Sequence, residues 1–169
     1  MMIELIETNQ FHAYPNALRF ILAVKDTGLR IAAAATTKNV NALLERIRLD
    51  EFAGEEGLSY EVVPSSYNLL NVLIANVSGR DFEQGKPYPE IFLTAADELG
   101  LSPEKCFVVE DAVNSVQGAK AGNIAALGLG RANDEEPLAN ANADLIVTIF
   151  DAVSLDALTE KRLKRVGVR

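Results

Sequence analysis

Apolar residues recur along this chain in two patterns. In some stretches they return every three or four residues, which places them on one helix face, and in others they form short uninterrupted runs, as in strands covered on both faces. The first pattern predicts helices over 15–28, 40–47, 92–99, 113–121 and 154–163. The second predicts strands over 30–35, 69–77, 106–109, 125–127 and 145–147, with a turn ahead of the strand as an alternative within 69–77. Because helices and strands alternate, we expect an α/β fold with a parallel sheet flanked by helices.

One segment, residues 53–84, departs from this alternation. It mixes glycine, serine and acidic residues with an apolar stretch and lengthens the link that precedes Lys86. About 30 residues rarely support a core of their own. We therefore interpret 53–84 as an insertion and expect 1–169 to form a single domain.

Several polar residues lie where helices or strands begin or end. We expect the acids at 134–136 to begin a helix, Asp144 to stand at the start of a strand and Ser154 to cap the last helix. The basic tail at 161–169 is expected to fray. These residues have structural explanations and are not candidates for chemistry.

Composition and charge narrow the class of protein. The chain is 49% hydrophobic and 24% charged, which predicts a folded domain with a buried core and excludes a disordered chain. Its 16 basic against 24 acidic residues give a net charge of -8, so a clamp on a nucleic-acid backbone is not expected.

No apolar run approaches the roughly 20 residues of a membrane helix, and residues 1–9 do not resemble a signal peptide. We expect a cytoplasmic protein, with neither a membrane nor nucleic acid as partner. The single cysteine, Cys106, excludes an internal disulfide.

Three polar clusters directly follow predicted strands or the insertion. They are Thr36, Thr37, Lys38 and Asn39, then Gly85, Lys86 and Pro87, and finally Glu110 and Asp111. Each alone has an ordinary explanation as a helix cap, a solvated loop or a match to a helix dipole. Together they offer hydroxyl, amide and ammonium donors opposite two carboxylates, which suits a phosphate group bridged to a hard cation such as Mg²⁺. In parallel sheets such ligands lie at the carboxyl ends of the strands.

These clusters carry a family resemblance. Residues 107–113 (FVVEDAV), continued by 117–122 (QGAKAG), resemble the fourth motif of the haloacid dehalogenase superfamily of phosphatases and phosphomutases. Residues 85–92 (GKPYPEIF) resemble its third motif, and 32–39 resemble its second, in the form found in the β-phosphoglucomutase-like branch. The resemblance covers roughly residues 11–158 apart from 53–84. It implies a Rossmann-like parallel sheet flanked by helices.

The resemblance also implies a reaction and roles for residues. The reaction is Mg²⁺-dependent phosphoryl transfer through an aspartyl-phosphate, on a small phosphorylated metabolite. The catalytic residues carried over are Lys86 and Thr36, the substrate phosphate-binding residues are Thr37, Lys38 and Asn39, and the metal ligands are Glu110 and Asp111. This agrees with the chemistry of phosphoryl transfer, which depends mostly on positioning and charge neutralisation.

Two departures from the family pattern accompany these matches. The nucleophile of the family is the first Asp of an Asp-x-Asp motif at the end of the first strand, and a cap follows it. Residues 1–12 hold only Glu4 and Glu7 as acids, so we expect the nucleophile motif, the first strand and the cap to be missing from this chain. Alanine also stands at position 35, where the family has a Ser or Thr, and Thr36 is the candidate to compensate.

A missing central strand would leave a gap between the strands at 30–35 and 106–109. We expect these strands to pair directly, or a partner segment to supply the strand, or the chain to associate with itself.

Three functions stay open at this point. The chain is the core of a phosphatase or phosphomutase, as a fragment, a truncated product or half of a split enzyme. Alternatively, it is a noncatalytic relative that keeps a phosphate-binding or assembly role. A receiver-like signalling domain is the third possibility, and the late position of Glu110 and Asp111 speaks against it.

Overall fold

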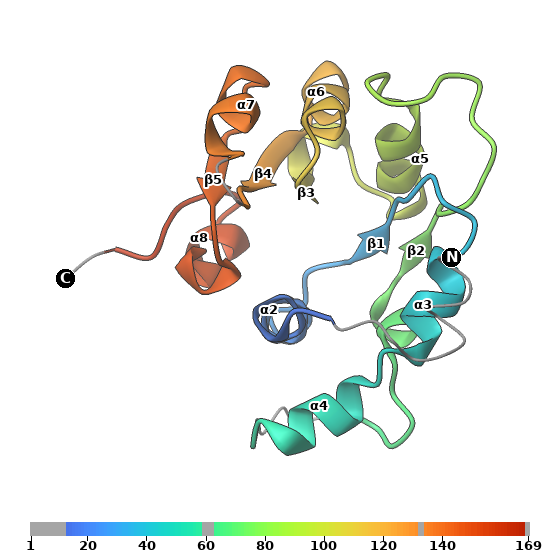
Figure 1. The fold of residues 1–169 in the computed structure, drawn as a ribbon, viewed down its shortest axis with the longest axis vertical. Coiled ribbons are helices and arrows are strands. Elements are labelled where there is room, and N and C mark those ends of the chain that lie inside the picture. The colour runs from blue at the N-terminus through green and yellow to red at the C-terminus, as the bar shows by residue number, and fades with distance from the viewer. Residues whose placement is uncertain (1–12, 59–62, 132–133, 168–169) are drawn as a thin grey trace. The chain divides into compact units, whose positions relative to one another are not determined.

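The protein forms two compact units in the computed structural model, Met1–Asp81 and Phe82–Arg169 (Figure 1). The structure describes residues 13–58, 63–131 and 134–167. Each unit combines helices with short parallel strands, so the α/β class expected from the sequence is confirmed. The expectation of a single domain over 1–169 stays a prediction, as does the reading of 53–84 as an insertion.

The first unit contains a two-stranded parallel pair. Its described elements are α2 (Pro15–Asp26), β1 (Ala32–Ala33), α3 (Val40–Arg46), α4 (Leu49–Glu55), the 3₁₀ helix η1 (Leu69–Val72) and β2 (Ala75–Asn76). In the pair, Ala32 lies opposite Ala75, and Ala33 lies opposite Asn76. The stretch 69–77 is therefore a turn followed by a strand, which was one of the two alternatives. The helix α4 was not expected from the sequence.

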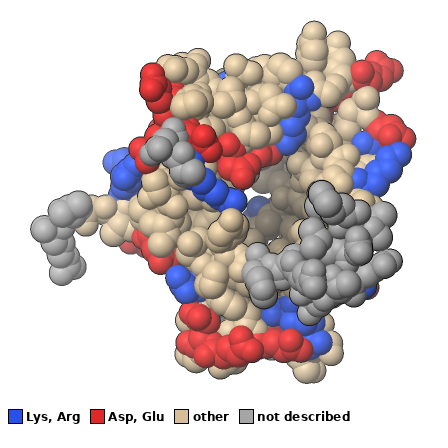
Figure 2. Space-filling view, in the orientation of Figure 1, with Lys and Arg blue, Asp and Glu red and all other residues tan. Residues whose placement is uncertain are grey.

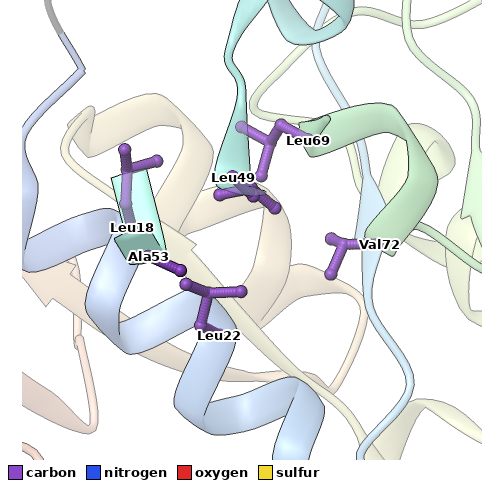
Figure 3. Packing of buried hydrophobic residues seen from close by; sticks show 6 residues of the cluster. All are labelled: Leu18, Leu22, Leu49, Ala53, Leu69 and Val72. Carbon is purple, nitrogen blue, oxygen red and sulfur yellow. The ribbon is translucent and has the colours of Figure 1, made fainter. Parts of the chain in front are cut away.

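The core of the first unit is made by helices more than by strands. Figure 3 shows the side chains of its buried cluster, which are Leu18 and Leu22 of α2, Leu49 and Ala53 of α4, and Leu69 and Val72 of η1. In each α-helix the two residues are four apart, so they share one face. Segment 53–84 thus contributes to the core through Ala53, Leu69 and Val72.

A polar contact fixes the start of α4 against the loop that follows it. The Arg48 guanidinium donates to both carboxylate oxygens of Asp50, at 2.9 and 2.6 Å, and the backbone N–H of Ser66 donates to the same carboxylate at 2.8 Å. Chiefly through the Arg48 hydrogen bond, with a further contribution from Ser66, the pKa of the Asp50 carboxyl is lowered to about 2. The acidic side chains of α4 gather at the lower edge of the view in Figure 2.

The second unit contains a three-stranded parallel sheet. Its described elements are α5 (Glu90–Glu98), η2 (Pro103–Lys105), β3 (Phe107–Glu110), α6 (Val113–Ala121), β4 (Ala125–Leu129), α7 (Glu135–Asn140), β5 (Leu145–Val147), η3 (Phe150–Ala152) and α8 (Leu155–Thr159). The strand order is β3-β4-β5. Helix α6 packs on β3 and β4, α7 packs on β4 and β5, and the two helices contact each other, so they cover the same face (Figure 1).

The polar residues at the ends of elements behave as their types predict. The carboxylate of Asp144, just ahead of β5, accepts from the backbone N–H of Ala126 at 2.7 Å. The Ser154 hydroxyl oxygen caps α8 by accepting from the backbone N–H of Ala157 at 3.3 Å. Helix α7 follows directly after Asp134. These three expectations are confirmed.

The expectation that the tail from 161 onward frays is wrong for the residues up to Val166, which are held by hydrogen bonds. Arg165 forms an antiparallel bridge with Val153, and the backbone N–H groups of Ser154 and Val166 donate to carbonyls across this bridge. The guanidinium of Arg165 also donates to the Ile146 carbonyl of β5 at 2.6 Å. Helix α8 ends at Thr159, ahead of the expected 163, because the chain turns back there to make these hydrogen bonds.

In their own sheets, β1 and β3 each stand at one end of the strand order. The direct pairing of 30–35 with 106–109 therefore stays a prediction. Among the described residues, no helix is long and apolar enough to cross a membrane.

Candidate functional site

Lys86 is the centre of a polar cluster in the second unit. Its ammonium nitrogen lies 2.6 Å from Oε1 of Glu110 and donates to the Ser115 hydroxyl at 2.9 Å. It also lies 4.9 Å from the centre of the Phe92 ring. The side chains of Lys86 and Glu110 are only 13% and 17% exposed. A cation that is this far removed from water is held by a carboxylate, a hydroxyl and an aromatic face together.

The fold places these groups by a strand end and a close helix contact. Glu110 is the last residue of β3, and Ser115 lies in the first turn of α6. At Gly118 of α6 a Cβ atom would come within 3.2 Å of the carbonyl oxygens of Pro87 and Tyr88. The absence of a side chain at position 118 therefore favours the close approach of α6 to the segment that follows Lys86.

Asp111 directly follows Glu110 and has a different environment. Its side chain is 53% exposed, and its Oδ2 lies 3.8 Å from Nη1 of Arg131, which lies two residues after β4. An exposed pair at this distance contributes little to stability. The Asp111 carboxylate is thus accessible to a ligand at the carboxyl end of the sheet.

The first unit holds the other predicted cluster, Thr36 to Asn39, between β1 and α3. The backbone N–H of Asn39 lies 3.5 Å from the Thr37 hydroxyl oxygen. Asn39 is the N-cap residue of α3, but its side chain makes no capping hydrogen bond. Lys38 pairs with Asp81 at 3.2 Å, and both side chains are largely exposed, at 71% and 91%. The helix-cap explanation of this cluster therefore finds no support in the side chain of Asn39.

The structure brings Lys86 into contact with Glu110, and Asp111 is the next residue after Glu110. Thr36, Thr37, Lys38 and Asn39 belong to the first unit, and Lys86, Glu110 and Asp111 belong to the second. That the two sets form one site stays a prediction.

Sequence reasoning missed three polar residues at these strand ends. Ser78 and Ser115 are the buried polar residues of the described chain, and Arg131 lies beside Asp111. Ser78 and Arg131 each follow a strand by two residues, so the rule that led to Glu110 and Asp111 applies to them as well. Nothing local in the sequence marks Ser115, since its role depends on Lys86.

A divalent cation has only part of a site in the described residues. They contain no group of three or more His, Cys, Asp or Glu side chains placed to hold a metal ion. Mg²⁺ is often bound through one or two carboxylates completed by waters and substrate phosphate, and the exposed Asp111 carboxylate has the right chemistry for one of them. Glu110 also offers a carboxylate, although its Oε1 accepts from Lys86.

Comparisons with known proteins agree on one family. The family model described as haloacid dehalogenase-like hydrolase, in the class of hydrolases, matches residues 3–123. The protein SUPPRESSOR OF QUENCHING 1, chloroplastic, of Arabidopsis thaliana is 33% identical over 147 residues, which are 86% of this chain and 12% of that protein. Beta-phosphoglucomutase of Mycobacterium tuberculosis (strain CDC 1551 / Oshkosh) is 30% identical over 152 residues, which are 88% of this chain and 52% of that protein.

A solved structure gives the same result. The archaeal beta-phosphoglucomutase from Pyrococcus sp. strain ST 04 matches with a TM-score of 0.67 and 26% identity, over 95% of this chain and 61% of that one. The present chain spans about half the length of the curated beta-phosphoglucomutase that it matches.

Proposed function

The chain belongs to the haloacid dehalogenase-like hydrolase family, and from this premise we propose that it binds the phosphate group of a small phosphorylated metabolite for phosphoryl transfer, as part of a phosphatase or phosphomutase. The observation that carries the proposal is the Lys86 ammonium, held by Glu110 and Ser115 at the carboxyl end of β3. A fixed cation at this end of a parallel sheet is suited to an anionic ligand.

Each candidate residue has a role in this proposal. Lys86 balances the negative charge of the phosphoryl group, and its bonds to Glu110 and Ser115 fix its position before the ligand arrives. Thr36 and Thr37 provide hydroxyl donors, and Lys38 and Asn39 provide ammonium and amide donors. Since phosphoryl transfer depends on positioning and charge neutralisation, donors of these types account for much of the required chemistry.

Mg²⁺ is the proposed cofactor. Asp111, with its exposed carboxylate, and Glu110 would hold it, together with waters and a phosphate oxygen of the ligand. When bound, the ion would neutralise phosphate charge. With two carboxylates, one of them paired with Lys86, we expect the chain to bind Mg²⁺ weakly.

The nucleophile is not part of the proposal. No Asp-x-Asp motif occurs in the 169 residues, so the chain offers phosphate and metal ligands but not the aspartate that the family uses to form the phosphoenzyme. The substrate class we propose is a phosphorylated sugar, because beta-phosphoglucomutases are among the relatives.

A noncatalytic phosphate-binding or assembly module is the second candidate function. The observation that favours it is Ala35, which has no hydroxyl where the family has a Ser or Thr. Binding of phosphate without turnover is what this alternative predicts.

A titration of the chain with inorganic phosphate, with and without Mg²⁺, tests the proposal by the rise in melting temperature. We expect a saturable rise for the native chain, and an affinity at least about tenfold lower in Lys86→Met, because a charged hydrogen-bond partner is lost. The matched control is Lys120→Met, since Lys120 also forms a 2.6 Å ion pair within the second unit, with Asp144, but is not a candidate ligand. Equal affinities in the native chain and Lys86→Met contradict the proposal.

A further inference from the structure

Ser78 lies at the carboxyl end of the strand pair in the first unit. It follows β2 by two residues, as Ala35 follows β1 by two residues, and the two strands run parallel. Both positions are therefore at the end of the pair where ligands of parallel sheets bind. The segment around Ser78 also touches the polar cluster after β1, since a Cβ atom at Gly79 would lie 3.1 Å from the Cα of Lys38.

Hydrogen bonds fix both the backbone and the side chain of Ser78. Its backbone N–H donates to Oδ1 of Asn76 at 3.0 Å, and Nδ2 of Asn76 donates to Oδ1 of Asn41 at 2.9 Å. The Ser78 hydroxyl oxygen accepts from the backbone N–H of Ala35 at 3.1 Å. The backbone N–H of Gly79 donates to the Ala35 carbonyl at 2.8 Å. The hydroxyl of Ser78 is thus held in place beside Ala35.

These hydrogen bonds leave the hydroxyl hydrogen of Ser78 unused. A hydroxyl has one donor hydrogen and two acceptor lone pairs. The acceptor side is used by Ala35, whereas no acceptor for the hydroxyl hydrogen is found among the described residues. Ser78 is only 6% exposed, so bulk water has little access to the hydroxyl. A fixed donor with little access to water stabilises negative charge better than a mobile, solvated one.

The charges around Ser78 suit an anion. The Arg80 guanidinium donates to the Asn76 carbonyl at 2.9 Å, two residues before Ser78. Among the described residues, Lys38 pairs with the exposed Asp81 carboxylate, an ion pair that a ligand displaces at little cost. Arg80 thus lies close to Ser78 in the chain, and Lys38 belongs to the polar cluster that the segment around Ser78 touches.

We infer that Ser78 is a phosphate-binding residue, whose hydroxyl donates to an anionic phosphate oxygen held after β1 and β2 beside Thr36 and Thr37. It provides a side-chain hydroxyl next to Ala35, which has none. This inference rests on the proposed phosphate-binding function and adds a residue from a strand end that the family motifs in this sequence do not include.

The test is a set of phosphate titrations on the full chain. Inorganic phosphate with Mg²⁺ is the probe. For each variant, the dissociation constant for phosphate and the melting temperature without phosphate are measured. In Ser78→Ala we expect phosphate affinity to fall about tenfold or more, as for loss of a hydrogen bond to a charged group. Adding Ala35→Ser to Ser78→Ala should recover part of the affinity, since a hydroxyl returns to the same strand end. Thr27→Val is the matched control, because it removes another hydroxyl of the first unit, one that donates to the Val24 carbonyl.

The outcomes separate the inference from the proposed function. Saturable phosphate binding that is the same in the native chain and in Ser78→Ala overturns the inference alone, even if the melting temperature of Ser78→Ala falls, because Ser78 then has a purely structural role. No saturable binding by the native chain overturns the proposed function and the inference with it. A selective loss in Ser78→Ala, with Thr27→Val unchanged, supports both.

Discussion

The Nζ atom of Lys86 lies 2.6 Å from Oε1 of Glu110, a residue 24 positions away in the sequence. The contact joins the loop ahead of α5 to the end of β3, and both side chains are mostly removed from water. The position of the cation therefore depends on the strand end and on α6, which provides Ser115. A ligand that binds Lys86 meets a group already held in place.

Replacing Lys86 tests how much this contact stabilises the second unit. Lys86→Met leaves the Glu110 carboxylate without its cation in a mostly buried position, so we expect the free energy of unfolding to fall by about 1–3 kcal/mol. The Lys120–Asp144 pair is more exposed, since its side chains are 32% and 40% accessible to water. We therefore expect Lys120→Met to lower the free energy of unfolding by at most about 1 kcal/mol. Urea denaturation of both variants measures the difference. Equal losses would mean that burial of the Lys86 pair has no energetic effect.

The low pKa of Asp50 predicts how the first unit responds to acid. Its carboxyl has a pKa of about 2 in the folded chain against an ordinary 3.8, mainly because Arg48 donates to it. The folded state thus binds this proton less tightly than the unfolded state does. The contribution of Asp50 to stability is fully present above about pH 4 and is lost as the pH falls from there toward 2.

Asp50→Asn isolates this effect from other titrating groups. We expect the melting temperature of the native chain to fall more steeply than that of Asp50→Asn between pH 5 and pH 3, because the variant has no carboxyl to protonate. Parallel slopes for the two proteins would show that the hydrogen bonds of Asp50 do not affect the pH dependence of stability.

Gly118→Ala tests the close approach of α6 to the segment after Lys86. The added Cβ would meet two backbone carbonyl oxygens at 3.2 Å and Cε2 of Phe92 at 3.3 Å. Overpacking of this kind costs about 1–3 kcal/mol, which exceeds the gain of at most about 1 kcal/mol from replacing glycine by alanine in a helix.

The control for this substitution is Gly54→Ala in α4, where no atom lies within 4 Å of the added Cβ. It should stabilise the chain by about 0.5–1 kcal/mol. We also expect Gly118→Ala to weaken phosphate binding, because Pro87 and Tyr88 adjoin Lys86. Thermal unfolding and the phosphate titration check both points, and a stabilised Gly118→Ala variant would contradict the packing argument.

A polypeptide of these 169 residues should not hydrolyse small phosphate esters above background. A two-step reaction through an aspartyl-phosphate needs a nucleophilic aspartate, and the sequence has no Asp-x-Asp motif. Phosphate release from sugar phosphates in the presence of Mg²⁺ is the measurement. Robust Mg²⁺-dependent release that disappears in Lys86→Ala would contradict the prediction and would make Asp111 the nucleophile to test.

Most of the regular elements were predicted from the spacing of apolar residues, because an element that buries one face needs apolar residues at regular intervals. Helices α2 and α6 and strand β5 lie where the pattern predicts them. Helix α4 was missed because it has only seven residues and holds a glycine and several acids. Its start is fixed by contacts with Ser66, far along the chain, which no local pattern shows.

The candidate site was predictable to the extent that it is local. Glu110 and Asp111 directly follow a buried strand, and this alone marks them as candidates. The pairing of Lys86 with Glu110 and Ser115 depends on how three separate elements pack, so a reading of local polar clusters treats Glu110 only as a metal ligand. Ser78 directly follows the predicted strand within 69–77 and was overlooked because the segment that contains it was interpreted as an insertion.

The two edges of the three-stranded sheet differ in how open they are to another strand. At β5, the Arg165 guanidinium occupies the Ile146 carbonyl, so an incoming strand would have to displace a cation that is bound to the backbone. At β3, no side-chain cation among the described residues binds a backbone carbonyl of the strand, and Val109 is 38% exposed. Growth of the sheet is therefore directional: we expect a strand that joins it to add beside β3, next to Glu110.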